Sequence, residues 1–194
     1  MKSALLLLIL ILPLCQKATG QTAHFSGDCL VISDAKQRFK LPGVGYDANE
    51  DDPPTPPKVH AIKKLHGEYF VVISTSSWSR GGRMSHGAGA TGIESYIEWL
   101  HIADGKIKDR KGFLYESWRH NRSGNGFRWQ GSILSIQTDA EIPERIAAKE
   151  EDSWETITFT FDAFHPEDGI KEEHSKPWNP FAPYEQTHPT RRSS

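Results

Sequence analysis

Aromatic and guanidinium side chains alternate with glycine and asparagine between residues 118 and 129 (WRHNRSGNGFRW). Aromatic rings stack on sugar rings or on cations, and guanidinium groups bind sulfate, phosphate or carboxylate through paired hydrogen bonds. Residues 106–129 also carry a local charge of +5. This pattern predicts a binding patch for an anionic or carbohydrate ligand, made of Trp118, Arg119, Arg122, Arg128 and Trp129. The alternative is an exposed hairpin loop whose tryptophans pack inward and bind nothing.

A second stretch, residues 77–92 (SWSRGGRMSHGAGATG), ends in a match to the dinucleotide-binding pattern G-x-G-x-x-G. That pattern binds a pyrophosphate where it directly follows a strand and opens a helix. Here ten polar or small residues, 77–86, separate it from the preceding strand, so we predict a glycine-rich loop instead. Because loops on a sheet scaffold often carry binding residues, Arg83 and His86 join the predicted patch.

Carboxylates and histidines in the same region support an alternative function. Two carboxylates across a cleft can hydrolyse a glycosidic bond. A small extracellular hydrolase would use one of three glutamates with one of two histidines: Glu94, Glu98 or Glu116 with His86 or His101. The sequence contains no G-x-S-x-G nucleophile motif, so a non-enzymatic binding domain is the favoured prediction and the enzyme remains open.

The nine histidines do not follow a metal-binding spacing. No H-E-x-x-H, H-x-H or Cys/His pair at zinc spacing occurs. Glu98 and His101 have the spacing of a carboxylate-bridged site, but such sites need a second copy, which the sequence lacks. We therefore expect neither a metal ion nor another cofactor.

The first 20 residues have the anatomy of a secretory signal peptide. An apolar run, Ala4–Leu14, follows Lys2, and Ala18-Thr19-Gly20 forms a small-x-small cleavage site, so cleavage is expected between Gly20 and Gln21. The protein is thus predicted to be secreted or periplasmic. Eleven apolar residues fall short of the roughly 20 that cross a bilayer, so no transmembrane segment is expected.

Cysteine usage excludes an intramolecular disulfide in the mature chain. Cys15 lies inside the signal, and Leu14 precedes it where a lipoprotein signal has a small residue, so no lipid anchor is expected. Cys29 alone remains, and its apolar neighbours predict a small buried side chain, with an intermolecular bridge as the alternative. Asn121-Arg122-Ser123 is a glycosylation sequon, meaningful only in a eukaryotic host.

The charge balance narrows the class of partner. Without residues 1–20 the chain has 21 basic and 25 acidic residues, a net charge of −4, whereas nucleic-acid-binding domains normally show a basic excess. The expected partner is an anionic glycan or another component of the cell envelope, and the oligomeric state stays open. A third possible function is structural: an envelope assembly protein whose strand edge or Pro-rich tail meets another chain.

The chain length fits one domain, predicted over residues 21–164. Residues 42–57 (PGVGYDANEDDPPTPP) are predicted to form an exposed acidic, Pro-rich loop, because prolines cannot donate to a β-ladder and the carboxylates repel one another. Residues 165–194 contain five prolines and no periodicity, which predicts a disordered tail.

Short β-like runs separated by turn signals dominate the domain. Strands are predicted at 29–33, 38–41, 58–65, 68–76, 106–118, 127–138 and 156–161. Ile93–Ala103 fits a strand before the turn Asp104-Gly105 and also fits a helix, with the strand favoured. Glu144–Glu151 after Pro143 predicts a short helix.

The fold class predicted is therefore all-β, or β-rich α+β. Seven to eight antiparallel strands would form a single sandwich or barrel with one or two short helices.

Overall fold

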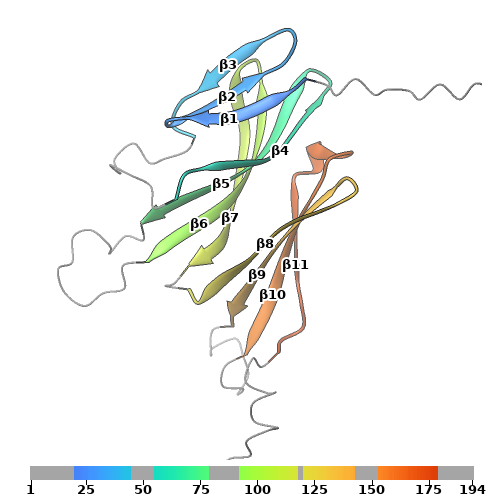
Figure 1. Cartoon of the computed structure of the whole chain (residues 1–194). Coiled ribbons are helices and arrows are strands. Elements are labelled where there is room, and N and C mark those ends of the chain that lie inside the picture. Colours follow the sequence, from blue (N-terminus) through green and yellow to red (C-terminus); the bar gives the residue numbers. More distant parts are fainter. Residues whose placement is uncertain (1–19, 45–54, 79–91, 118–119, 143–152, 179–194) are drawn as a thin grey trace, which may run out of the picture.

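The computed structural model describes residues 20–44, 55–78, 92–117, 120–142 and 153–178 (Figure 1). These residues form eleven β-strands and one 3-10 turn, η1 (Pro166–Asp168), so the all-β prediction is confirmed. The signal peptide and the helix predicted at Glu144–Glu151 lie outside the described residues, apart from Gly20. Within the described ranges, no helix is long and apolar enough to cross a lipid bilayer.

The strands form two antiparallel sheets. The smaller one has the order β1-β2-β3, with β1 at Thr22–Ser26, β2 at Cys29–Ser33 and β3 at Arg38–Leu41. The larger one has eight strands in chain order: β4 (Lys58–Leu65), β5 (Glu68–Trp78), β6 (Ile93–Ala103), β7 (Lys106–Ser117), β8 (Arg122–Gln130), β9 (Ile133–Glu141), β10 (Trp154–Asp162) and β11 (Ile170–His174).

The larger sheet bends sharply between β7 and β8. A single residue pair, Ser117 with Arg122, joins these two strands, so the ladder does not continue along their length. Strands β4–β7 and β8–β11 thus form two halves that diverge from this joint and enclose a core (Figure 1). Strands β4 and β11 are the edges of the sheet and do not pair with each other, so the sheet is not closed into a barrel.

The inner core lies between these two halves. Strand β10 shows how the sequence builds it, because Ile157, Phe159 and Phe161 are buried while the threonines between them are only partly covered. This confirms the predicted alternation of that strand. The facing half contributes Phe70 and Trp99, among others, to the same cluster.

The outer core lies between β4–β7 and the three-stranded sheet. Alternate residues of β5 contribute to the two cores. Tyr69, Val71 and Ile73 pack toward β1–β3, whereas Phe70 and Val72 face the inner core. A strand buried on both faces has a nearly continuous apolar sequence, which explains the uninterrupted run in β5. Strands β4–β7 are therefore the middle layer of three.

Two tight turns fix the middle layer. His66 and Gly67 have φ values of 50° and 92°, and Asp104 and Gly105 have values of 53° and 69°. Positive φ at both central residues is the geometry of the two-residue turns that match strand twist. Both predicted hairpins are therefore confirmed, and residues 93–103 form a strand rather than a helix.

The stretch predicted as one strand at 127–138 is instead the hairpin of β8 and β9. Gly131 and Ser132 form its turn, with Gly131 at a φ of 61°. Gly131, which lies inside the predicted strand 127–138, is thus a turn residue. Gly112, inside the predicted strand 106–118, pairs regularly with Glu98, and the register shifts of β7 lie on either side of it.

The boundary predicted at residue 165 is wrong for the described part of the tail. Residues 170–174 form β11, which pairs with β10, and Ile170 is buried in the inner core. One buried residue followed by charged ones gave too weak a pattern to predict a strand. In the acidic loop 42–57, Val44 is buried in the outer core, while residues 45–54 and the end of the tail, 179–194, lie outside the described residues.

Candidate functional site

The structure separates the residues of the predicted patch on β8. Arg122 and Trp129 pair with Ala140 and Leu134 of β9, both buried in the inner core, and therefore face inward. Arg128 pairs with Ser135 and lies on the opposite face of the strand. Trp118, Arg119, Arg83 and His86 lie outside the described residues.

The two inward residues of β8 also differ in role. Arg122 donates from Nη1 to the backbone oxygen of Leu114 at 2.8 Å, which ties its guanidinium group to the joint between β7 and β8. Trp129 is 48% exposed, so an aromatic surface is available at the open end of β8. The described part of the predicted patch thus contains one structural arginine, one exposed arginine and one exposed indole.

The glutamates proposed for hydrolysis lie on the outer face of β6. Glu98 pairs with Ile73 of the outer core, and its carboxylate accepts hydrogen bonds from Thr75, at 2.8 Å, and from Arg110. Glu94 accepts a hydrogen bond from the Tyr96 hydroxyl at 2.8 Å. Burial and this carboxylate raise the pKa of Tyr96 to about 12. Both glutamates are therefore occupied by neighbouring side chains.

The histidine and the third glutamate of that hypothesis lie elsewhere. His101 faces the inner core, stacks on Phe70 at 4.8 Å and contacts Glu68 through Nε2 at 2.8 Å. Glu116 lies near the far end of β7, beside a pocket. The described carboxylates and His101 do not converge on one cleft.

The pocket opens on the inner face of strands β4–β7. It lies near the ends of these strands that are farthest from the turns at 66–67 and 104–105. Its volume is about 240 Å³. Five strands contribute its lining: Lys58 and His60 of β4, Ser74, Thr75 and Ser76 of β5, Ser95 of β6, Tyr115 and Glu116 of β7, and Phe127 of β8, together with Thr55 and Pro56.

His60 connects the two halves of the sheet across this pocket. It occupies a bulge in β4, and its ring stacks on Phe127 of β8 with centroids 3.8 Å apart and planes 3° apart. Its Nε2 lies 2.8 Å from the Ser74 hydroxyl. Burial and, secondarily, the charge of Lys58 lower the pKa of His60 to about 4, so the imidazole is neutral at pH 7.

Tyr115 provides a hydrogen-bond donor to the pocket. Its hydroxyl oxygen accepts the backbone N–H of Gly126 at 2.9 Å, while its own proton has no acceptor among the described residues. Burial raises the pKa of this phenol, so the proton stays in place near neutral pH. The ring contacts Phe127, with centroids 5.3 Å apart.

The glycines of β8 make room for this tyrosine. A Cβ at Gly124 would lie 2.3 Å from Cζ of Tyr115, well inside van der Waals contact. The Thr138 hydroxyl donates to the backbone oxygen of Tyr115 at 2.6 Å and holds the other end of the residue. The Gly-Asn-Gly sequence at 124–126, which resembles a loop, is a bulged strand shaped around Tyr115.

The contact between Ser74 and His60 has the geometry of a nucleophile and its base. A general base must become an imidazolium during the reaction, and both burial and Lys58 oppose that charge. No carboxylate among the described residues forms a hydrogen bond with the other ring nitrogen of His60. The pair is therefore better suited to orienting hydroxyl groups than to activating one.

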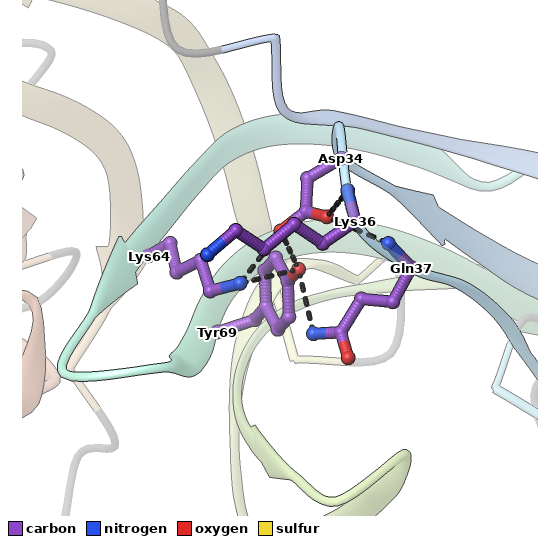
Figure 2. Close-up of polar contacts among 5 residues, drawn as sticks. All are labelled: Asp34, Lys36, Gln37, Lys64 and Tyr69. Atoms are coloured by element: carbon purple, nitrogen blue, oxygen red, sulfur yellow. Dashed lines mark hydrogen bonds and ion pairs between the residues drawn. The ribbon is translucent and has the colours of Figure 1, made fainter.

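A second polar cluster joins the three-stranded sheet to the middle layer (Figure 2). The Asp34 carboxylate accepts hydrogen bonds from Lys64, at 2.6 Å, from the Tyr69 hydroxyl, and from the backbone N–H groups of Lys36 and Gln37, at 2.8 and 2.9 Å. These bonds, the one from Lys64 first, hold the pKa of Asp34 far below its ordinary value. Because its carboxylate and phenol are bonded to neighbouring groups of the protein, we interpret this cluster as a structural link between the two sheets.

Two single residues of interest lie on the surface. Cys29 is half-buried rather than buried, and its hydrogen bond to Asp28 raises the pKa of the thiol. Asn121, in the glycosylation sequon, is exposed with a φ of 45°, and its side-chain amide donates to Glu141. The free thiol at Cys29 and the glycosylation site at Asn121 both stay predictions.

Sequence reasoning missed His60, Ser74 and Tyr115 because they come from strands far apart in the chain. One signal was present: counting back from the turn at His66-Gly67 places His60 opposite Ile73, one residue before Ser74. No sequence signal places Tyr115 beside Phe127, since that contact depends on the bend between β7 and β8.

Within the described ranges, no group of three or more His, Cys, Asp or Glu side chains is arranged to hold a metal ion. The pocket is therefore defined by hydroxyl groups, a neutral imidazole and aromatic rings. No protein family model matches the chain, and no curated protein or solved structure shows significant similarity to it.

Proposed function

We propose that this chain is a secreted, non-enzymatic binding domain that holds one small polar ligand in the pocket between β4 and β8. A saccharide unit is the ligand class that fits best. The observation that carries the proposal is the unused hydrogen-bonding capacity of Tyr115 and Ser95 in a pocket with Phe127 in its wall. Hydroxyl groups recognise sugar hydroxyls, and an aromatic ring packs against the apolar face of a sugar.

The size of the pocket supports a single ring rather than a long chain. Pockets for drug-sized molecules span roughly 300–1,000 Å³. The present volume of about 240 Å³ lies just below that range. A longer glycan would therefore insert one unit and extend the rest along the surface toward the exposed Trp129.

The charges at the pocket favour a ligand without net charge. Lys58 and Glu116 contribute one charge of each sign, and His60 is neutral. A purely anionic ligand would gain from the lysine and lose to the glutamate. The anionic glycan suggested by residues 106–129 therefore fits this pocket less well than a neutral saccharide.

Secretion rests on the sequence alone. The apolar run of residues 4–14 and the small residues before Gln21 are the features of an exported chain. Export would bring the domain to the envelope or the exterior, where saccharides are abundant ligands.

Titration with neutral and acidic monosaccharides, followed by backbone amide chemical shifts, tests the proposal. Shifts are expected to cluster on β4, β5, β7 and β8 at the pocket. Ser74→Ala should weaken binding about two- to tenfold, the range for one lost hydrogen bond. Ser135→Ala, on the opposite face of β9, is the matched control. Shifts on the outer face, or equal effects of the two variants, would contradict the proposal.

The 2.8 Å contact between Ser74 and His60 supports one competing function, a hydrolase. In that case a chromogenic ester such as p-nitrophenyl acetate would be turned over, and Ser74→Ala would abolish the turnover. We expect the variant and the parent chain to show the same slow background rate, because the imidazolium is disfavoured at this position.

A further inference from the structure

We infer that the preferred ligand carries a positive charge at one end and a negative charge at the other, with an uncharged polar part between them. This inference rests on the proposed function for the binding site, the pocket between β4 and β8, and it names a zwitterion in place of the neutral saccharide as the ligand. It names a class of ligand more specific than a polar molecule: a small zwitterion whose amine and acid groups are several bonds apart, as in a short peptide.

The register of the strands places the two charges at opposite sides of the pocket. Lys58 of β4 pairs with Ser74 of β5, and Glu116 of β7 pairs with Ser95 of β6. Strands β5 and β6 therefore lie between the two charged residues. Three inter-strand spacings separate the backbones of β4 and β7 by about 14 Å, and both side chains line the pocket from their own side.

Each charge acts on a different neighbour. Burial is the main cause of both pKa shifts; the charge of Lys58 also lowers the pKa of His60, and the charge of Glu116 adds a smaller rise to the pKa of Tyr115. Neither charge contributes to the shift at the other position. The pocket thus has a positive side on β4 and a negative side on β7.

Neither charged group is neutralised by another described residue. Lys58 and Glu116 are both exposed, and neither forms an ion pair or a side-chain hydrogen bond with another described residue. By contrast, Arg110 is paired with Glu98 and Lys64 with Asp34. A bound ammonium and a bound carboxylate would supply the missing counter-charges.

The floor between the two sides consists of hydroxyl groups. Ser74 contacts His60, and Ser95 has no hydrogen-bond partner among the described residues. Tyr115 of β7, whose proton has no acceptor among the described residues, also lines the pocket. Such groups hydrogen-bond to an amide or a hydroxyl, which is the chemistry required of the middle of the ligand.

The test uses zwitterions that differ in the distance between their charges. Glycine, β-alanine, γ-aminobutyrate and glycylglycine would be titrated into the full mature chain at low salt, with amide chemical shifts as the readout. Affinity is expected to rise at least threefold from glycine to γ-aminobutyrate or glycylglycine. N-acetylated glycylglycine and glycylglycine amide, which lack one charge each, should bind about two- to fivefold more weakly, as expected for one exposed ion pair.

Variants of the two charged residues give the matching result. Lys58→Gln and Glu116→Gln should each weaken glycylglycine about two- to fivefold, whereas Lys40→Gln on β3 and Glu173→Gln on β11 should not. Exchanging the charges, with Lys58→Glu and Glu116→Lys together, should restore binding because the ligand can reverse its direction. Thermal melting of each variant separates a lost contact from a lost fold.

Three outcomes overturn the inference. Equal binding of zwitterions and singly charged analogues would show that the charges are not used. Saccharide binding in the pocket without any zwitterion binding would overturn the inference and leave the proposed function standing. If neither class produced shifts at the pocket, both would fall.

Discussion

Two polar clusters lie on the same middle layer of this protein and differ in how completely they are paired. In the cluster of Asp34, Lys64 and Tyr69, the carboxylate accepts four hydrogen bonds and the phenol bonds to three side chains. In the pocket cluster, Tyr115 uses its oxygen but not its proton, and Lys58 and Glu116 have no counter-charge among the described residues.

This difference distinguishes polar groups that stabilise the fold from polar groups that can bind a ligand. A polar group whose bonds are all satisfied within the protein contributes to stability and has nothing left for a ligand. A group with unused capacity beside an empty volume contributes less to stability and is available to another molecule. The pairing of the polar groups and the open volume beside the pocket cluster therefore distinguish the two places.

Replacement of Gly124 should have the largest effect on the pocket cluster. In Gly124→Ala the new Cβ would meet the Tyr115 ring, which Gly126 and Thr138 hold in place. Overpacking of this kind should lower the free energy of unfolding by about 3 kcal/mol. Chemical denaturation measures the change.

Gly112→Ala is the control for that experiment. Its nearest neighbour, Cγ of Glu98, is 3.9 Å away, so the added methyl group fits. The variant should be as stable as the parent or more stable by about 0.5 kcal/mol. If the two glycine variants lost equal stability, Tyr115 would not be held as described.

Tyr69→Phe should have the next largest effect, in the closed cluster. Loss of the hydroxyl removes a donor to Asp34 and an acceptor for Lys64 and Gln37 in a position where Tyr69 is only 1% exposed. We expect a loss of about 2 kcal/mol in unfolding free energy. The ligand affinity of the pocket should not change, and a change would show that the clusters are coupled.

Acid should weaken the two clusters in different pH ranges. The pKa of His60 is about 4 in the fold against an ordinary 6.5, so the unfolded chain binds the proton first and stability falls as the pH drops from 6.5 toward 4. After allowance for solvent screening the loss should be about 1–2 kcal/mol. His60→Gln should flatten the stability curve over this range, as measured by denaturation at several pH values.

The closed cluster should respond only at lower pH. The pKa of Asp34 is lowered from its ordinary 3.8, so its contribution is complete above that value and is lost as the pH falls below it. Asp34→Asn should therefore remove acid sensitivity below pH 4 and leave the range above it unchanged. The reverse pattern in the two variants would contradict the assignment of the two ranges.

Tyr115→Phe should have the smallest effect on stability and a clear effect on binding. The lost bond from Gly126 borders an open pocket, where water replaces it, so the cost should be about 0.5–1 kcal/mol. Ligand affinity should fall several-fold, as measured by the same titration. Tyr69→Phe and Tyr115→Phe each remove a single oxygen atom, so a comparison of the two variants distinguishes the roles of the two clusters.

Local patterns predicted most of the strands. Alternation at 156–161 and the turns at His66-Gly67 and Asp104-Gly105 act within a few residues, so the sequence carries them directly. The hairpin at Gly131-Ser132 was missed because apolar residues continue on both sides of it. Strand β11 was missed because its single buried residue, Ile170, depends on pairing with β10.

The candidate site was harder to predict than the fold. The aromatic and arginine pattern at 118–129 drew attention to β8, but strand pairing sends Arg128 to one face and Trp129 to the other. The pocket depends on long-range geometry: a bulge at His60, a bulge at Tyr115 and a bend that brings Phe127 over both. None of these three features follows from residue spacing alone.

The single residue pair between β7 and β8 has a mechanical consequence. Backbone hydrogen bonds resist sliding of one strand past the next. Among the described residues of β7 and β8 only one residue pair is joined in this way, so side-chain packing and a few side-chain hydrogen bonds, those of Tyr115, Arg122 and Thr138, keep the two halves in register. A molecule bound to Ser74 of one half and Phe127 of the other would link the two halves of the sheet directly. Ligand binding would then make it harder for the two halves to slide past each other, even at positions far from the bound molecule.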